Sequence, residues 1–339
     1  MPTLPSLLRR TFAATGLLLA ALAAGHATAQ VREHSFKLSL SIAGDNAQTR
    51  SAAFFKSEVE RLSGGKMKVQ LFPGSQLGPD LQVLSGLRAG AIDIQVATTS
   101  LLGTIDPAFN VYDIPFLFRN FDEVYAVADG EPGKRFQAIG EKNGFILLNT
   151  HSGVWRNLTN RTRAVGSAAD IKGLKVRTLQ NTVFIDFWKA LGANPVAIPF
   201  PELYGALEGG TVDAQENANG VTVFAKLMEV QKHFTATQHG AYVGIVMFSG
   251  PVWQRLNEDE RKVLREAGAT SGAQWRKSFL EEDQMLLKRI AEKLTVTPLS
   301  PAARAELERL AQPVIDKHMA TFDAALVQQV RAAIATVRK

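Results

Sequence analysis

The chain has 339 residues, a formal net charge of +6 and no cysteine. The lack of cysteine excludes disulfide scaffolds, thiol nucleophiles and cysteine-based metal sites. The positive excess is small and is not gathered into a basic run, so we do not expect nucleic acid as a partner.

The first 29 residues have the pattern of a secretory signal peptide. Arg9 and Arg10 precede an apolar run from Thr11 to Ala24, and Ala27-Thr28-Ala29 follows with the small residues of a cleavage site. The run is shorter than the roughly 20 apolar residues that span a bilayer. We therefore expect residues 1–29 to be removed on export, by the general secretory or the twin-arginine route, which leaves 310 of the 339 residues.

Short runs rich in β-branched and aromatic residues alternate with helical stretches over most of the remaining chain. The predicted strands are Ser35–Ile42, Lys66–Pro73, Ala91–Ala97, Phe145–Thr150, Leu174–Thr178, Asn194–Pro199, Val212–Asn217 and Ala241–Ser249. The predicted helices between them include Ala47–Leu62, Asp80–Ala89, Val183–Leu191 and Glu202–Glu208. Such alternation predicts an α/β fold with mainly parallel sheets.

A short sequence motif occurs twice and divides the chain into two similar parts. Leu87–Gln95 and Leu207–Gln215 each contain a helix end, a glycine and the start of a strand, and each follows the order strand, helix, strand, helix. This internal repeat predicts two α/β lobes. We place the first lobe at residues 30–152 plus about 242–282, and the second at residues 153–241 plus about 283–339.

The C-terminal third is almost wholly helical. Asn257 and Glu260 have the spacing of a capping box. Four apolar residues then share one helix face: Trp275, Phe279, Leu286 and Ile290. This long helix either bridges both lobes as a strut or packs on one sheet as an ordinary amphipathic helix. A further helix begins at Pro301, and we expect Pro313 to kink or end it.

Polar residues near strand ends are the candidates for a ligand site, because open α/β sheets bind ligands beyond the carboxyl ends of their strands. Arg177 and Asn217 close two predicted strands, and Arg156 lies in the predicted loop Ser152–Asn157. An arginine fork suits a carboxylate through two parallel charge-assisted hydrogen bonds. For an isolated arginine a surface ion pair is the more common explanation, so spacing alone does not decide.

Several ordered motifs resemble the solute-binding proteins of tripartite ATP-independent periplasmic (TRAP) transporters. The resemblance rests mainly on Lys172–Asn181, Ala190–Pro195, Ile198–Leu207 and Val212–Asn217. It extends to Pro73–Gly78, Asp113–Phe118, Glu229–Lys232 and the helical C-terminus, and so covers nearly all of the chain after residue 29.

The resemblance implies a two-lobed periplasmic-binding-protein fold, with the ligand cleft between the lobes and a long C-terminal helix bridging them. It implies a non-catalytic periplasmic protein without a cofactor, which captures a small carboxylate and delivers it to membrane subunits. The sequence shows no sign of dimerisation, so we expect a monomer. The implied ligand-binding residues are Arg177 as the clamp, Asn217, Arg156, the apolar wall Phe200 and, from the first lobe, Ser41, Thr98 and Thr99. The solute stays open among C4-dicarboxylates, sugar acids and related carboxylates.

Two departures from the family pattern narrow the choice of solute. Ala218 stands where the family often has proline, and Thr98 stands where members that bind sialic acid carry an acidic residue. Sialate is therefore disfavoured. Trp155, next to Arg156, either lines the cleft or packs beneath a loop.

Two other classes of protein compete with transport. A cleft enzyme would need catalytic motifs, yet the sequence has no nucleophile elbow, phosphate loop, dinucleotide glycine pattern or zinc-protease motif. His233 and His239 are not spaced to share a helix face. His151 and Glu216 are far apart in the sequence and would form an acid–base pair only if the fold brought them together. A binding protein that feeds a signalling receptor cannot be separated from a transport component by sequence.

Overall fold

The computed structural model describes residues 30–338, and the predicted signal peptide lies outside this range. The strands are β1 (His34–Leu40), β2 (Met67–Phe72), β3 (Ile94–Thr98), β4 (Phe145–Asn160), β5 (Lys175–Thr178), β6 (Asn194–Ala197), β7 (Ala214–Ala218), β8 (His233–Ser249) and β9 (Thr295–Thr297). The α-helices are α2 (Ala47–Leu62), α3 (Asp80–Ala89), α4 (Phe121–Asp129), α5 (Glu131–Lys142), α6 (Ala168–Ile171), α7 (Thr182–Ala190), α8 (Leu203–Glu208), α9 (Asn219–Phe224), α10 (Gly250–Gln254), α11 (Glu258–Lys293), α12 (Pro301–Met319) and α13 (Ala324–Val337). Short 3-10 helices include η1 (Thr99–Thr104) and η2 (Pro107–Asp113).

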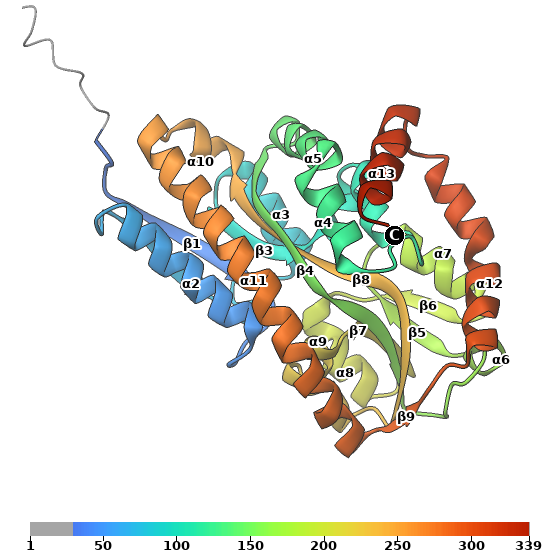
Figure 1. Cartoon of the computed structure of the whole chain (residues 1–339). Coiled ribbons are helices and arrows are strands. Elements are labelled where there is room, and N and C mark those ends of the chain that lie inside the picture. Colours follow the sequence, from blue (N-terminus) through green and yellow to red (C-terminus); the bar gives the residue numbers. More distant parts are fainter. Residues whose placement is uncertain (1–29, 339) are drawn as a thin grey trace, which may run out of the picture.

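The strands form two similar groups within one mixed sheet, in the order β2-β1-β3-β8-β4-β7-β5-β6 (Figure 1). In the first group β1 pairs in parallel with β2 and β3, and in the second group β5 pairs in parallel with β6 and β7. Each group thus has its first strand in the middle. We call these groups, with their helices, the first and second lobes, and their common topology confirms the two-lobed α/β prediction.

Two long antiparallel strands, β4 and β8, join the lobes. They pair with each other from end to end, while β8 also pairs with β3 and β4 with β7. The prediction of mainly parallel sheets is therefore wrong where the lobes meet, and two predicted strands were too short. Irregular register explains the error, because shifts such as that between His151 and Val154 interrupt the strand pattern that the sequence shows.

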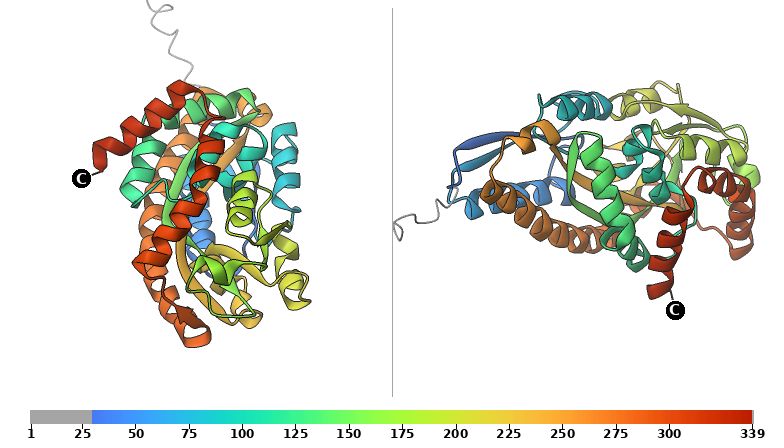
Figure 2. Two further views of the ribbon diagram at one scale, coloured as in Figure 1. Left: turned by 90° about the vertical axis from the view of Figure 1, so that its right-hand side faces the viewer. Right: turned by 90° about the horizontal axis from the view of Figure 1, so that it is seen from above.

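The 36-residue helix α11 bridges both lobes, as Figures 1 and 2 show. It packs against α2 of the first lobe, against β4, and against α9 of the second lobe. Asn257 caps its N-terminus together with Glu260, which confirms the predicted capping box. Trp275 is fully buried and donates its indole N–H to the Ala47 carbonyl oxygen at 3.1 Å. The strut interpretation is correct.

The chain returns to the first lobe at its end. Helix α12 packs against α7, and α13 then packs against α4 and α5 (Figure 1). Pro313 lies inside α12, which continues to Met319, so of the two predicted effects this proline does not end the helix. Among the residues described, none of the helices combines the length and apolarity that a bilayer crossing requires.

The largest apolar cluster spans the junction between the lobes. It contains residues of η2, α4 and α13 together with Leu179 and Phe184 of the second lobe. Separate clusters fill the first lobe around Phe55 and the second around Trp188. Apolar burial therefore helps to hold the lobes in the arrangement seen here.

Candidate functional site

A cavity lies between the lobes, with an empty volume of about 440 Å³ including its open mouth. The first lobe lines it with Ser41, Ile42, Gln48, Asp80, Val96, Ala97 and Thr98, the second lobe with Leu179, Phe200, Asn217 and Val221, and the two long strands with Arg156 and Tyr242. Most of these residues lie at or just beyond the carboxyl ends of strands, where ligands of α/β sheets bind.

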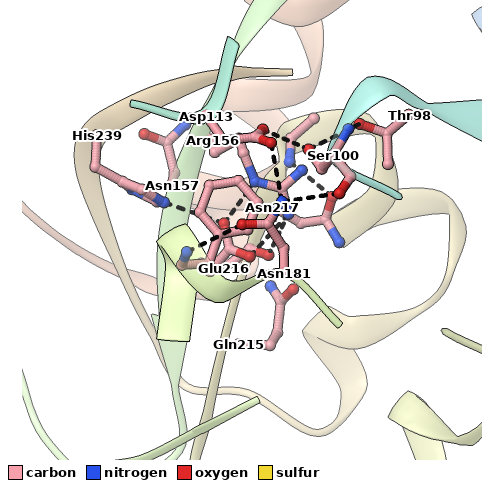
Figure 3. Close-up of polar contacts among 12 residues, drawn as sticks. Thr98, Ser100, Asp113, Arg156, Asn157, Asn181, Gln215, Glu216, Asn217 and His239 are labelled. Carbon is pink, nitrogen blue, oxygen red and sulfur yellow. Dashed lines mark hydrogen bonds and ion pairs between the residues drawn. The ribbon is translucent and has the colours of Figure 1, made fainter. Parts of the chain in front are cut away.

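Arg156 is held by a buried ion pair on the wall of the cavity. Its Nε and Nη2 atoms donate to the two carboxylate oxygens of Glu216 at 2.6 and 2.8 Å, and His239 Nε2 lies 3.0 Å from the same carboxylate (Figure 3). Burial raises the pKa of Glu216, but the charge of Arg156 and hydrogen bonds from His239 and Arg156 outweigh burial and hold that pKa at about 2. Glu216 is therefore ionised at neutral pH.

The placement of Arg156 corrects the prediction of a loop. It lies inside β4, where its backbone is aligned with Ala218 of β7 and Gly240 of β8. The polar and glycine residues before it resemble a loop in sequence, but β4 pairs with β8 on both sides of them, with a register shift between His151 and Val154. The Nη1 atom of Arg156 is buried and has no hydrogen-bond partner within the described chain.

Arg177 is also fully buried, but it lacks a carboxylate partner. Its Nε and Nη2 atoms donate to the backbone oxygen of Ile198 at 2.9 and 2.6 Å. Its Nη1 atom has no hydrogen-bond partner among residues 30–338. Desolvation lowers the pKa of Arg177 to about 10, so the group is still charged at neutral pH.

Arg177 itself is not on the cavity wall, although Leu179 two residues later is. Its charge nevertheless acts on the site: burial raises the pKa of Asp80 on the opposite wall, and the charge of Arg177 partly opposes that rise. A buried cation without a bonded anion is costly unless an anion joins it. Arg177 of β5 and Arg156 of β4, two strands separated by β7, thus each have a buried Nη1 group without a hydrogen-bond partner among residues 30–338.

Of the other residues predicted to bind the ligand, all but one line the cavity. Asn217 lines the cavity and its Oδ1 accepts from the backbone of Ala218 at 3.1 Å. Phe200 and Ser41 also line it. The Thr98 hydroxyl, although on the wall, donates to the Val243 carbonyl at 3.1 Å.

Thr99 is not among the lining residues. Its hydroxyl donates to the carbonyl oxygen of Val243 at 3.3 Å, beneath the cavity wall. Trp155 is likewise outside the cavity, and its ring packs against Phe121 at a centroid distance of 4.6 Å.

Sequence reasoning missed three polar lining residues: Gln48, Asp80 and Tyr242. Asp80 follows a strand and begins α3, a position at which a side chain can reach the mouth of a sheet, and this was the available signal. The Ser41 hydroxyl donates to the Asp80 carboxylate. Burial raises the pKa of Tyr242 to about 12, so its phenol is neutral at physiological pH.

A second polar cluster connects the lobes beside the cavity. Asn181, the N-cap of α7, directs its amide nitrogen at the Ser100 carbonyl oxygen at 2.8 Å, Asn110 Oδ1 at 3.1 Å and Asp113 Oδ2 at 3.0 Å. Ser100 donates to the other oxygen of Asp113 at 2.6 Å (Figure 3). Burial raises the pKa of Asp113 to about 7.

His151 and Glu216, the acid–base pair considered from the sequence, are not paired in the structure. His151 contacts Asn149 at 3.0 Å and its ring packs on Trp275 at 3.8 Å, whereas Glu216 pairs with Arg156 and His239 instead. Within residues 30–338 no group of three or more histidine, aspartate and glutamate side chains could hold a metal ion.

Comparisons with known proteins agree with this architecture. Residues 39–321 match the family described as bacterial extracellular solute-binding protein, family 7 (DctP). The 2,3-diketo-L-gulonate-binding periplasmic protein YiaO of Escherichia coli is 32% identical over 276 residues, which are 81% of this chain and 84% of that protein.

Two solved structures resemble the chain over most of its length. The sugar acid binding protein DctPAm of Advenella mimigardefordensis, in complex with galactonate, matches with a TM-score of 0.87 and 32% identity, covering 90% of this chain and 99% of that one. A TRAP periplasmic solute binding protein of Sulfurospirillum deleyianum with bound succinate matches with a TM-score of 0.84 and 28% identity, covering 89% and 100%.

Proposed function

The chain belongs to bacterial extracellular solute-binding protein family 7, and from that premise we propose that it captures a small organic acid through an arginine clamp and delivers it to the membrane subunits of a TRAP transporter. It acts in the periplasm as a monomer, after removal of residues 1–29, and releases its solute chemically unchanged. Relatives with bound galactonate and succinate support an organic acid as the solute.

The observation that carries this proposal is the state of Arg177. Its guanidinium is buried, retains its charge at neutral pH, and has an Nη1 atom without a partner among the described residues. A solute carboxylate supplies both the missing acceptor and the missing negative charge. Arg156 Nη1 offers a second donor, and the amide of Asn217 on the cavity wall offers a neutral one.

The mechanism of capture follows from the position of the cavity. A solute that contacts both lobes favours the form in which they are closed, and it does so only through contacts that the open form lacks. We place the division between the lobes at residues 152/153 and 241/242, in the strands that join them, and near residues 282/283 within α11. Closure then presents one combined surface to the membrane subunits.

The test is the melting temperature of the protein with a panel of organic acids, sugar acids and uncharged sugars. A ligand that binds only the folded state must raise the melting temperature. We expect a rise with at least one carboxylate, and we expect Arg177→Ala to abolish it, because the solute charge is then buried without its partner.

Arg177→Lys is the matched control, since it keeps the positive charge but loses the planar fork. We expect it to recover only part of the affinity. Stabilisation by uncharged compounds alone, or unchanged binding by a folded Arg177→Ala protein, would rule out the clamp. Mass analysis of the recovered ligand distinguishes a binding protein from an enzyme, which would alter it.

A further inference from the structure

We propose that Asp80 restricts the solute to hydroxylated monocarboxylates, such as aldonic acids, and excludes dicarboxylates of the same length. This inference rests on the proposed function, because it assumes that a solute carboxylate occupies the arginine side of the cavity. According to this inference, the first-lobe wall of the cavity, opposite the arginines, determines which solutes bind.

The two walls of the cavity carry opposite charges. Arg156 lines the cavity and the charge of buried Arg177 acts on it, whereas the first lobe contributes the carboxyl group of Asp80. A solute that bridges the lobes with its carboxylate toward the arginines must place its far end against the first-lobe wall. A second carboxylate there would face a like charge.

The charged side chains around the cavity limit how many negative charges a bound solute can carry. Arg156 is paired with Glu216, so Arg177 is the buried cation left for a solute carboxylate. Burial raises the pKa of Asp80, and at a pH where this group ionises its carboxylate adds a negative charge to the opposite wall. His239 adds nothing, since burial lowers its pKa and keeps it neutral. The first carboxylate of the solute joins Arg177, whereas a second one beside ionised Asp80 has no cation and is repelled by a like charge where water is excluded.

The same wall is suited to hydroxyl groups. A carboxylate accepts up to four hydrogen bonds, and Ser41 donates one to Asp80. The amide of Gln48, which can donate and accept, and the phenol of Tyr242 also line this part of the cavity. A solute hydroxyl that donates to Asp80 forms a charge-assisted bond, which is stronger than a bond between neutral groups.

The test compares acids that differ only in the second charge. Binding of gluconate and galactonate is measured by calorimetry against glucarate and galactarate, which have the same hydroxyls, and erythronate against succinate at four carbons. Because burial raises the pKa of Asp80, the measurement is made at about pH 8, where its carboxyl is more fully ionised. We expect at least one aldonate to bind roughly tenfold or more tightly than its matched diacid.

Asp80→Asn replaces the carboxylate with a neutral side chain of nearly the same shape. We expect it to weaken aldonate binding about tenfold and to reduce the discrimination against diacids. Asp45→Asn is the matched control, because its side chain is 85% exposed and is not among the cavity-lining residues, so the ratio should stay as in the unaltered protein.

The outcomes separate the two proposals. Equal or tighter binding of the diacids, or an unchanged ratio in folded Asp80→Asn protein, overturns the role of Asp80 but leaves the carboxylate clamp standing. If none of the acids binds, the proposed function fails and this inference fails with it. Should Asp80→Asn not fold, the comparison of aldonate and diacid in the unaltered protein still decides.

Discussion

The two buried arginines, Arg156 and Arg177, have different kinds of partner. Arg156 is neutralised internally by Glu216, while Arg177 has only a backbone carbonyl as its partner. The first arrangement serves the folded protein, and the second leaves a charge that an external anion can satisfy. The two arginines are equally buried and therefore differ in their partners, and this difference is what supports Arg177 as the proposed clamp.

Asp113 is a residue whose titration should affect stability. Burial raises its pKa to about 7, above the value of about 3.9 for an unfolded chain. Its contribution to stability is full below about pH 4 and is lost as the pH rises through about 7, because only the folded state holds the proton in between. Asp113→Asn should remove roughly 2–3 kcal/mol of the decline in unfolding free energy between pH 5 and pH 8.

Urea unfolding of both proteins at the two pH values checks this prediction. An asparagine can keep both hydrogen bonds, since its amide can donate to Ser100 and its oxygen can accept from Asn181. Other groups titrate identically in the two proteins, so the difference between them isolates Asp113. Parallel stability curves for the two proteins would contradict the assignment.

At the scale of elements, contact between α11 and β4 depends on glycine. A Cβ atom at Gly268 would lie 2.7 Å from the backbone oxygen of Leu148 and 2.9 Å from its Cβ, so the helix or the strand would have to move. We expect Gly268→Ala to lower the unfolding free energy by roughly 1–3 kcal/mol, despite the better helix propensity of alanine.

Gly205 in α8 provides the control, because a Cβ atom there would meet nothing within 4 Å. Gly205→Ala should leave stability unchanged or raise it by up to about 1 kcal/mol. Thermal or urea unfolding of both variants measures the difference. If the two substitutions had equal effects, close packing of α11 on β4 would not be the cause.

At the scale of the whole molecule, Asn181 connects the two lobes. Its amide nitrogen contacts Ser100, Asn110 and Asp113, while its oxygen accepts from the first N–H groups of α7. Asn181→Ser keeps a good N-cap but removes the contacts across the lobes. We expect the apparent affinity for the solute to fall by about tenfold, since the closed form becomes less populated.

Calorimetry with a stabilising acid measures that affinity, and small-angle scattering reports the balance of open and closed forms. Asn181→Ala adds loss of the cap, which should reduce stability by about 1 kcal/mol more than the serine variant does. An Asn181→Ser protein with unchanged affinity and scattering would show that these contacts do not influence closure.

The sequence by itself determined the local elements and the family. Helices α2 and α3 have the predicted bounds, the capping box at Asn257 is present, and the internal repeat appears as a repeated strand order. These features depend on periodicity, capping and turn residues that are close together in the chain. The positions of strand ends indicated Arg177, Asn217 and Arg156 as candidate ligand residues. The resemblance added Phe200, Ser41, Thr98 and Thr99, and the role of all of them stays a prediction.

Only the tertiary structure decided how distant residues meet. The pairing of Arg156 with Glu216 spans 60 positions, and the contact of Ser41 with Asp80 spans 39. The sequence also did not predict that β4 and β8 continue through both lobes, because register shifts interrupt the strand pattern in the sequence. Charge compensation and cavity shape arise from side chains brought together by packing, and local sequence patterns carry no record of that packing.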